Sequence, residues 1–374
     1  MNITIFAGAR PNFIKVAPLI RVIRHEEQAG RDVHYSLVFA GRSDDPTLEP
    51  SLFSDLEIAP PDVCLGVSCE NLNELTGQVM SHFEQYLQQH PTDAVVVVDD
   101  LASTMAAAIV TKKQGILLAH IAAGTHSFDI SMPKEINRLV IDGLSDILFT
   151  AGISNNSIAN REGAELSKVY MVGNILIDNI RYNQGARSAD SRVCLAVPPR
   201  APYIVFTLNR KALMADRDNL RQMLQALLDH AGGMPVIAPL REEAAEVVKA
   251  LGLGYNTDLS TPLPSGGVGV GLIPPQSYLA FSHLLRHAHG IITDSGNVAE
   301  EATFYSVPCI TLNSYTEHIE TVKVGSNVLV GEDPVLLADA VDKMVSGTWK
   351  SSAIPDRWDG RTAERILQIL LERR

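Results

Sequence analysis

Short apolar runs alternate with longer helical patterns along almost the whole chain. Runs such as AVVVV at 94–98 and ILFT at 147–150 are nearly continuous in apolar residues. This pattern is typical of strands that are buried on both faces of a parallel sheet and joined by helices. The predicted strands span 3–7, 34–40, 94–98, 115–121, 147–150 and 168–172, and then 203–207, 235–238, 268–272, 290–293 and 307–312.

The strands fall into two series separated by a segment rich in small and turn residues, NQGARSADSRVCLAVPPRAP, which predicts a linker near 183–202. At 374 residues the chain also exceeds what one hydrophobic core usually supports. We therefore predict an α/β fold with Rossmann-like domains at 1–182 and 183–356. The segment 357–374 is predicted to be a helix that packs across a domain surface. The two domains are expected to face a cleft, and ligands bind beyond the carboxyl ends of such strands.

Composition narrows the possible partners. The net charge of −12 and the pI near 5.4 argue against non-specific binding to nucleic acid or anionic membranes. No apolar run reaches the roughly 18 residues of a membrane span, and the N-terminus reads as a strand and helix rather than a signal peptide. The cysteines, at 64, 69, 194 and 309, form no CxxC pair, so we expect reduced thiols in a cytoplasm.

A glycine cluster and a group of histidines suggest a cofactor site and a metal site, but the neighbouring sequence does not support either. The glycine cluster SGGVGVG at 265–271 is followed by LIPPQ, whereas a dinucleotide fingerprint opens a helix. His283, His287 and His289 have helical spacing but no acidic partner motif, which favours a partly buried helix face over a metal site. The sequence therefore predicts no cofactor and no metal.

The segment GIITDSGNVAEEATFYSVPCITL at 290–312 carries the most chemical information. It predicts a strand, a tight turn at Asp294, Ser295 and Gly296, a helix and a second strand. The unpaired backbone N–H groups at the start of that helix suit a diphosphate. Glu300 or Glu301, about one turn later, can accept from a vicinal diol such as a ribose. The alternative is a plain turn with a side-chain N-cap and surface glutamates.

An ordered series of motifs resembles the non-hydrolysing UDP-N-acetylglucosamine 2-epimerase family. The matching segments are ARPNFIKVAPLI at 9–20, VVVVDD at 95–100, HIAAG at 120–124, PKEINRLVID at 133–142, SDILFT at 145–150, EGAELSKVYMVGNILID at 162–178, LIPPQSYLAF at 272–281, TDSGNVAEEA at 293–302, TEH at 316–318 and VGSNVLVG at 324–331. The resemblance implies a GT-B-like fold, a UDP-sugar substrate in the interdomain cleft, a homodimer and a cytoplasmic role in supplying surface-polysaccharide precursors.

The resemblance also implies which residues bind substrate. Arg10 and Lys15 match basic residues after the first strand, with Arg10 expected near the diphosphate, where a fixed cation supplies positive charge. Ser295 and Gly296, with Asp294, match the phosphate turn, and Glu301 matches the carboxylate that resembles a ribose ligand. The alternative for Arg10 is a surface salt bridge, which contributes little.

Several catalytic positions depart from the family pattern. The family eliminates UDP with loss of the C2 proton and then adds UDP and a proton back, which needs positioned acid and base groups. Ala122 and Lys134 stand at glutamate positions of the family, and Asn209, kept as a substrate-binding candidate, stands at a histidine position. Asp100 matches the family aspartate.

Two further side chains are candidate replacements for the missing proton-transfer groups. His126, at a family arginine position, could act as a base, and Lys134 could do so if burial lowers its pKa; alternatively, both are spectators. Asn297 and Asn313 also replace family glycine and arginine residues. The glutamine-histidine pair of an allosteric second site is replaced in GRSDDPTLEP, so we predict no such site.

Three functions follow as hypotheses. The first is a UDP-N-acetylglucosamine 2-epimerase or a close relative. The second is another nucleotide-sugar reaction, glycosyl transfer or hydrolysis, in which Asp100 and the pair His126 and Lys134 face the anomeric carbon. The third is a UDP-sugar-binding homologue that has lost catalysis but keeps Arg10, Ser295 and Glu301.

Overall fold

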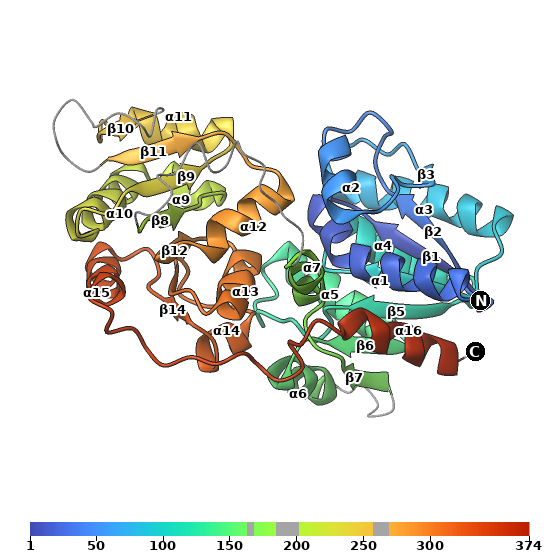
Figure 1. Ribbon diagram of the computed structural model, residues 1–374. Helices are drawn as coiled ribbons and strands as arrows, with labels where there is room; N and C mark the ends of the chain where they lie inside the picture. Colours follow the sequence, from blue (N-terminus) through green and yellow to red (C-terminus); the bar gives the residue numbers. More distant parts are fainter. Residues whose placement is uncertain (163–167, 185–201, 257–268, 374) are drawn as a thin grey trace. The chain divides into compact units, whose positions relative to one another are not determined.

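The computed structural model describes residues 1–162, 168–184, 202–256 and 269–373 (Figure 1). The chain divides into two compact units. Unit 1 contains Met1–Gln184 and Asp356–Arg374, and unit 2 contains Gly185–Pro355. Most of the linker predicted at 183–202, and the glycine cluster up to residue 268, lie outside the described residues.

Unit 1 is built on a parallel seven-stranded sheet with the order β3-β2-β1-β4-β5-β6-β7. Its strands are β1 (Asn2–Ala7), β2 (His34–Phe39), β3 (Val63–Cys64), β4 (Ala94–Val98), β5 (Leu117–Ile121), β6 (Ile147–Thr150) and β7 (Val169–Met171). Its helices are α1 (Arg10–Gln28), α2 (Pro50–Leu56), α3 (Leu72–Gln89), α4 (Ala102–Lys113), α5 (Pro133–Leu144), α6 (Ile153–Arg161), α7 (Ile175–Asn183) and α16 (Thr362–Glu372). All five residues of β4 are buried, which explains its continuous apolar run.

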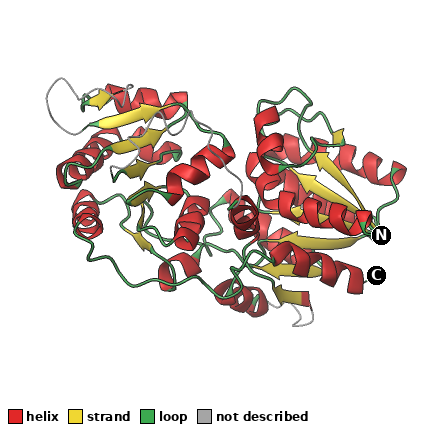
Figure 2. Ribbon diagram, viewed as in Figure 1, coloured by secondary structure: helices red, strands yellow, loops and turns green. Residues whose placement is uncertain are grey.

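Unit 2 repeats this architecture with a second parallel seven-stranded sheet, ordered β10-β11-β9-β8-β12-β13-β14. Its strands are β8 (Ile204–Phe206), β9 (Val236–Pro239), β10 (Tyr255–Asn256), β11 (Val270–Ile273), β12 (Gly290–Thr293), β13 (Cys309–Thr311) and β14 (Asn327–Leu329). Its helices are α9 (Lys211–Ala215), α10 (Arg217–His230), α11 (Glu242–Ala250), α12 (Tyr278–Arg286), α13 (Gly296–Tyr305), α14 (Ile319–Lys323) and α15 (Pro334–Val345). Figure 2 shows the strands of each unit flanked by helices.

The predicted fold class, two Rossmann-like parallel sheets, is confirmed. The pattern did not predict β3, β10 and β14, which are the short outer strands of the sheets and have only two or three residues each. Most residues of these outer strands are partly buried or exposed, so the strands lack the continuous buried run that predicts an inner strand. None of the described helices is long and apolar enough to cross a membrane.

The C-terminal helix α16 belongs to unit 1, where it contacts α1 and α7. The buried carboxylate of Asp178 accepts hydrogen bonds from the backbone N–H groups of Thr362 (3.2 Å) and Ala363 (2.7 Å). Asp178 therefore satisfies the N-terminal donors of α16 from a distant part of the sequence, as an N-cap residue otherwise does.

Candidate functional site

The turn between β12 and α13 leaves the first backbone N–H groups of the helix without a side-chain cap among the described residues. Ser295 is the N-cap, with extended φ and ψ of −103° and 124°, and its side chain makes no capping hydrogen bond within the described chain. Its backbone N–H donates to Thr293 Oγ1 at 3.0 Å. The next three N–H groups, of Gly296, Asn297 and Val298, have no partner inside the helix because they belong to its first turn. Three donors at the positive end of a helix dipole can bind a phosphate.

Asp294 binds backbone N–H groups of a neighbouring loop. Its Oδ2 accepts the backbone N–H groups of Asn209 (2.7 Å) and Arg210 (2.6 Å). Asp294 thus ties the loop after β8 to this turn and does not cap α13. Asn209 joins the turn through its backbone.

His318 lies directly against the turn. A Cβ atom at Gly296 would lie 2.3 Å from both Cδ2 and Nε2 of His318, so only glycine fits there without displacing the imidazole. Nδ1 of His318 is 2.9 Å from Oε1 of Glu300. His318 belongs to the TEH segment at 316–318, and no local sequence signal assigned it to the site.

Glu301 is a buried carboxyl with one unsatisfied oxygen. Glu300 and Glu301 are 6% and 7% exposed, so the alternative of surface glutamates is wrong. Oε2 of Glu301 has no hydrogen-bond partner among the described residues. Burial, together with the neighbouring charge of Glu300, raises the pKa of Glu301 to about 8. A buried, unpartnered carboxyl next to an anion-binding turn is suited to receive ligand hydroxyls.

The two predicted basic residues of unit 1 have different surroundings. Arg10 begins α1, and its Nη1 donates to Oε2 of Glu49 at 2.7 Å, in a pair that is partly exposed. Nζ of the buried Lys15 lies 2.5 Å from Oδ1 of Asp99, a residue in the left-handed region with φ of 61°. Asn12 donates to the other oxygen of Asp99 at 2.9 Å. Lys15 and Asn12 therefore fix an unfavourable backbone conformation at the end of β4.

Asp100 and Lys134 lie close together, but Arg138 holds the aspartate. Oδ2 of Asp100 accepts from Nε of Arg138 at 2.8 Å, and Nη2 lies 2.5 Å from the same oxygen. Nζ of Lys134 is 3.9 Å from Oδ1 of Asp100, and its side chain is 68% exposed. For Lys134 to act as a base, burial would have to lower its pKa. The described residues of unit 1 do not bury this side chain.

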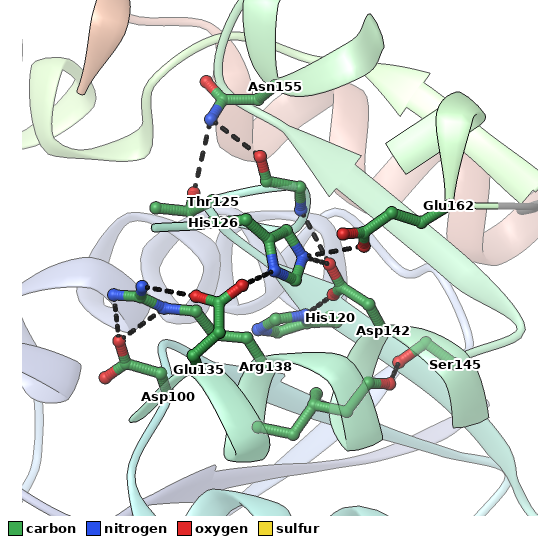
Figure 3. Close-up of polar contacts among 12 residues, drawn as sticks. Asp100, His120, Thr125, His126, Glu135, Arg138, Asp142, Ser145, Asn155 and Glu162 are labelled. Carbon is green, nitrogen blue, oxygen red and sulfur yellow. Dashed lines mark hydrogen bonds and ion pairs between the residues drawn. The ribbon is translucent and has the colours of Figure 1, made fainter. Parts of the chain in front are cut away.

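The buried His126 lies among three carboxylates, of which those of Glu135 and Asp142 are buried and that of Glu162 is exposed (Figure 3). Nδ1 is 2.8 Å from Oε1 of Glu135, and Nε2 is 3.1 Å from Oδ2 of Asp142 and 3.0 Å from Oε2 of Glu162. Burial alone would lower the pKa of His126, but the hydrogen bonds of Asp142 and Glu135 outweigh burial and raise it. The pKa of Glu135 is lowered to about 2, since hydrogen bonds from Ser127 and His126 outweigh its burial.

These contacts weigh against His126 as a mobile base. Both of its ring nitrogens face carboxylates and its side chain is fully buried. Ala122, at the other altered position of this region, has φ of 69° and carries no group that transfers a proton. The sequence suggested His126 as a candidate from its position, but it did not indicate that Glu135, Asp142 and Glu162 surround it.

Two parallel doubly wound units and an open helix start after a central strand define an α/β protein of the GT-B-like class. Residues 25–371 match the sequence model of the family described as UDP-N-acetylglucosamine 2-epimerase, and the chain belongs to that family.

Proteins of known identity align with nearly the whole chain. The UDP-N-acetylglucosamine 2-epimerase of Methanocaldococcus jannaschii is 31% identical over 378 residues, which cover 99% of each chain. A crystal structure of the enzyme from that organism, in complex with UDP-GlcNAc and UDP, superposes with a TM-score of 0.83 and covers 100% of both chains at 28% identity. The UDP-2,3-diacetamido-2,3-dideoxy-D-glucuronate 2-epimerase of Pseudomonas aeruginosa is 32% identical over 335 residues, 88% of each chain.

Proposed function

We propose that this protein binds a UDP-sugar and epimerises it at C2 by elimination and re-addition of UDP. The observation that carries the proposal is the match to the epimerase family over residues 25–371, together with 31% identity to the M. jannaschii enzyme over 99% of the chain. Fold alone would not support a reaction, because one fold hosts many reactions.

The nucleotide end of the proposed ligand is supported by the geometry of unit 2. The diphosphate accepts from the N–H groups of Gly296, Asn297 and Val298 and from the hydroxyl of Ser295, which makes no cap hydrogen bond within the described chain. The ribose hydroxyls donate to Glu301, whose Oε2 is otherwise unsatisfied among the described residues. Arg10, Lys15 and Asn209 stay predicted substrate-binding residues on the basis of the resemblance.

Several of the positions that would transfer the C2 proton of the sugar differ from the family pattern. Asp100 is positioned by Arg138 and is the acid or base that we propose for the C2 proton. Ala122 cannot transfer a proton, and the amide of Asn209 does not titrate, so the reaction has fewer proton-transfer groups than the family pattern. Losing such a group typically costs about 10²- to 10⁴-fold in rate. We therefore expect slow turnover of UDP-N-acetylglucosamine itself.

One experiment separates the possible functions. The protein is incubated with UDP-N-acetylglucosamine in deuterated water, and the C2 proton and the products are followed by NMR. Deuterium at C2 with the manno product is expected. Free sugar or a glycoside would instead indicate hydrolysis or transfer, and UDP binding without any exchange would indicate a binding homologue.

The resemblance also supports a homodimer and a cytoplasmic role in supplying precursors of surface polysaccharides. Sedimentation of the purified chain tests the first of these. A monomer at micromolar concentration would contradict it.

A further inference from the structure

In unit 1, three side chains direct one ligand atom each toward a common point (Figure 3). They are His126, in the loop after β5, Asp142, in α5, and Glu162, the C-cap residue of α6. Nε2 of His126 is 3.1 Å from Oδ2 of Asp142 and 3.0 Å from Oε2 of Glu162. All three ligand atoms lie within 4.8 Å of one another.

The contacts of the imidazole indicate which nitrogen is available. Nδ1 of His126 lies 2.8 Å from Oε1 of Glu135, where it donates its hydrogen to the carboxylate. Nε2 is also within hydrogen-bond distance of Asp142 at 3.1 Å, so a bound ion would take the place of the hydrogen that the ring otherwise donates there. If Nε2 is instead protonated, its one hydrogen has to serve two oxygens in different directions. A cation placed among the three atoms accounts for both short contacts.

Two of the three distances between the ligand atoms fit metal coordination, and the third, between Asp142 and Glu162, does not exceed 4.8 Å. Bonds of about 2.0–2.2 Å from one ion to nitrogen and oxygen ligands, at tetrahedral or octahedral angles, place neighbouring ligand atoms roughly 2.9–3.5 Å apart. The two contacts of His126 Nε2, 3.0 and 3.1 Å, fall in this range. The hydrogen bond from Nδ1 to Glu135 is the outer contact that orients most metal-bound histidines.

The local charge also calls for a cation. Four carboxylates, those of Asp100, Glu135, Asp142 and Glu162, are connected to Arg138 and to the imidazoles of His120 and His126. Negative charge exceeds positive charge in this group even if each imidazole carries a proton. The exposed Lys134 approaches only the outer carboxylate, Asp100, at 3.9 Å. Glu162 is exposed, but the buried charges of Glu135 and Asp142 are costly unless they are paired or bind a metal.

We propose that His126, Asp142 and Glu162 bind one divalent transition metal ion, with Glu135 orienting the imidazole. One imidazole and two carboxylates form a mixed nitrogen and oxygen ligand set that suits Zn²⁺ or Mn²⁺. Because the side chain of His126 is fully buried, we assign the ion a structural role. It ties α5 and α6 to the loop that follows β5.

The test uses untagged full-length protein dialysed against a chelator. Co²⁺ is titrated as a spectroscopic probe, and Zn²⁺ is then added in competition, followed by absorbance and calorimetry. The expected result is one ion per chain, a Co²⁺ spectrum of nitrogen and oxygen ligands, and a melting temperature that Zn²⁺ raises by roughly 5–10 °C at 100-fold excess over Kd.

Two variants link the ion to these residues. Glu162→Gln keeps the shape of the side chain but removes a charged ligand, so it should weaken Zn²⁺ binding by at least about 100-fold. Glu27→Gln is the matched control, because Glu27 pairs with the exposed His34 at 2.5 Å in a similar contact. It should bind Zn²⁺ like the unaltered protein.

Two results would overturn the proposal. One is the absence of any Co²⁺ spectrum and of any Zn²⁺-dependent rise in melting temperature in the unaltered protein, which is decisive even if Glu162→Gln does not fold. The other is equal Zn²⁺ affinity of Glu162→Gln and the unaltered protein. Nitrogen NMR that finds both ring nitrogens of His126 protonated with Zn²⁺ present would show that an imidazolium fills the centre instead.

Discussion

Replacing the buried carboxyl of Glu301 by an amide should stabilise unit 2 at neutral and alkaline pH. The folded protein raises the pKa of Glu301 from 4.5 to about 8, first because of burial and then because of Glu300. In the unfolded chain the group ionises near its ordinary pKa. When the chain folds at pH 7, Glu301 therefore has to take up a proton or be buried as a charged group. Either event costs free energy.

The size of the effect follows from linkage. A folded pKa above the unfolded one contributes stability that is complete below pH 4.5 and is lost as pH rises to about 8. At 1.36 kcal/mol per pH unit, the cost at pH 7 is about 3 kcal/mol. Glutamine does not titrate, so Glu301→Gln should remove this cost. If the new N–H groups of the amide find no partner, they add a separate cost of roughly 1–3 kcal/mol.

The assay is urea unfolding of Glu301→Gln at several values between pH 5 and pH 8.5. The chain has two tryptophans, and Trp349 lies in unit 2 whereas Trp358 lies in unit 1. A Trp358→Phe background therefore makes fluorescence report on unit 2. Glu243→Gln is the control, since Glu243 is an exposed glutamate of unit 2 and its loss should leave the unfolding free energy nearly unchanged.

The reasoning would be refuted if the unaltered protein showed no fall in unfolding free energy between pH 5 and pH 8. It would also be refuted if Glu301→Gln were no more stable than the unaltered protein at pH 8.5. A further consequence concerns ligand binding. If ribose hydroxyls donate to the ionised form, UDP binding at pH 7 should release protons, measured by calorimetry in buffers of different ionisation enthalpy.

Three other substitutions test the site and the fold. Gly296→Ala forces its methyl group against His318, so UDP affinity should fall at least about 10-fold by calorimetry, and His318→Ala in the same chain should restore part of it. Asp178→Ala removes the acceptor of two N–H groups at the start of α16 and should lower the unfolding free energy of unit 1 by about 2 kcal/mol in urea near pH 4. At that pH the carboxyl, whose pKa burial raises to about 6, is protonated in the folded chain, and an unchanged midpoint would contradict its role. Asp100→Asn should slow deuterium exchange at C2 by about 10²-fold or more, and unaltered exchange would remove this residue from the mechanism.

Local sequence determined the repeated parallel sheets. A strand buried on both faces leaves a continuous apolar run, so Ile147–Thr150 and Gly290–Thr293 have the predicted bounds in the structure. The turn after Gly290–Thr293 is likewise local, because the strand end, the small residues and the helix start are neighbours in the chain. The outer strands β3, β10 and β14 could not be predicted, since their pairing depends on a neighbouring strand and not on their own pattern.

The surroundings of the polar groups were decided only by tertiary structure. The sequence presents His126 and Glu162 as unrelated residues, and only the packing of α5 and α6 around the end of β5 brings their side chains together with Asp142. Likewise, the sequence shows two adjacent glutamates, but it does not show that both are buried or that one lacks a partner among the described residues. Charge, burial and hydrogen bonding depend on residues distant in the chain, whereas a strand or a helix start is specified by its neighbours.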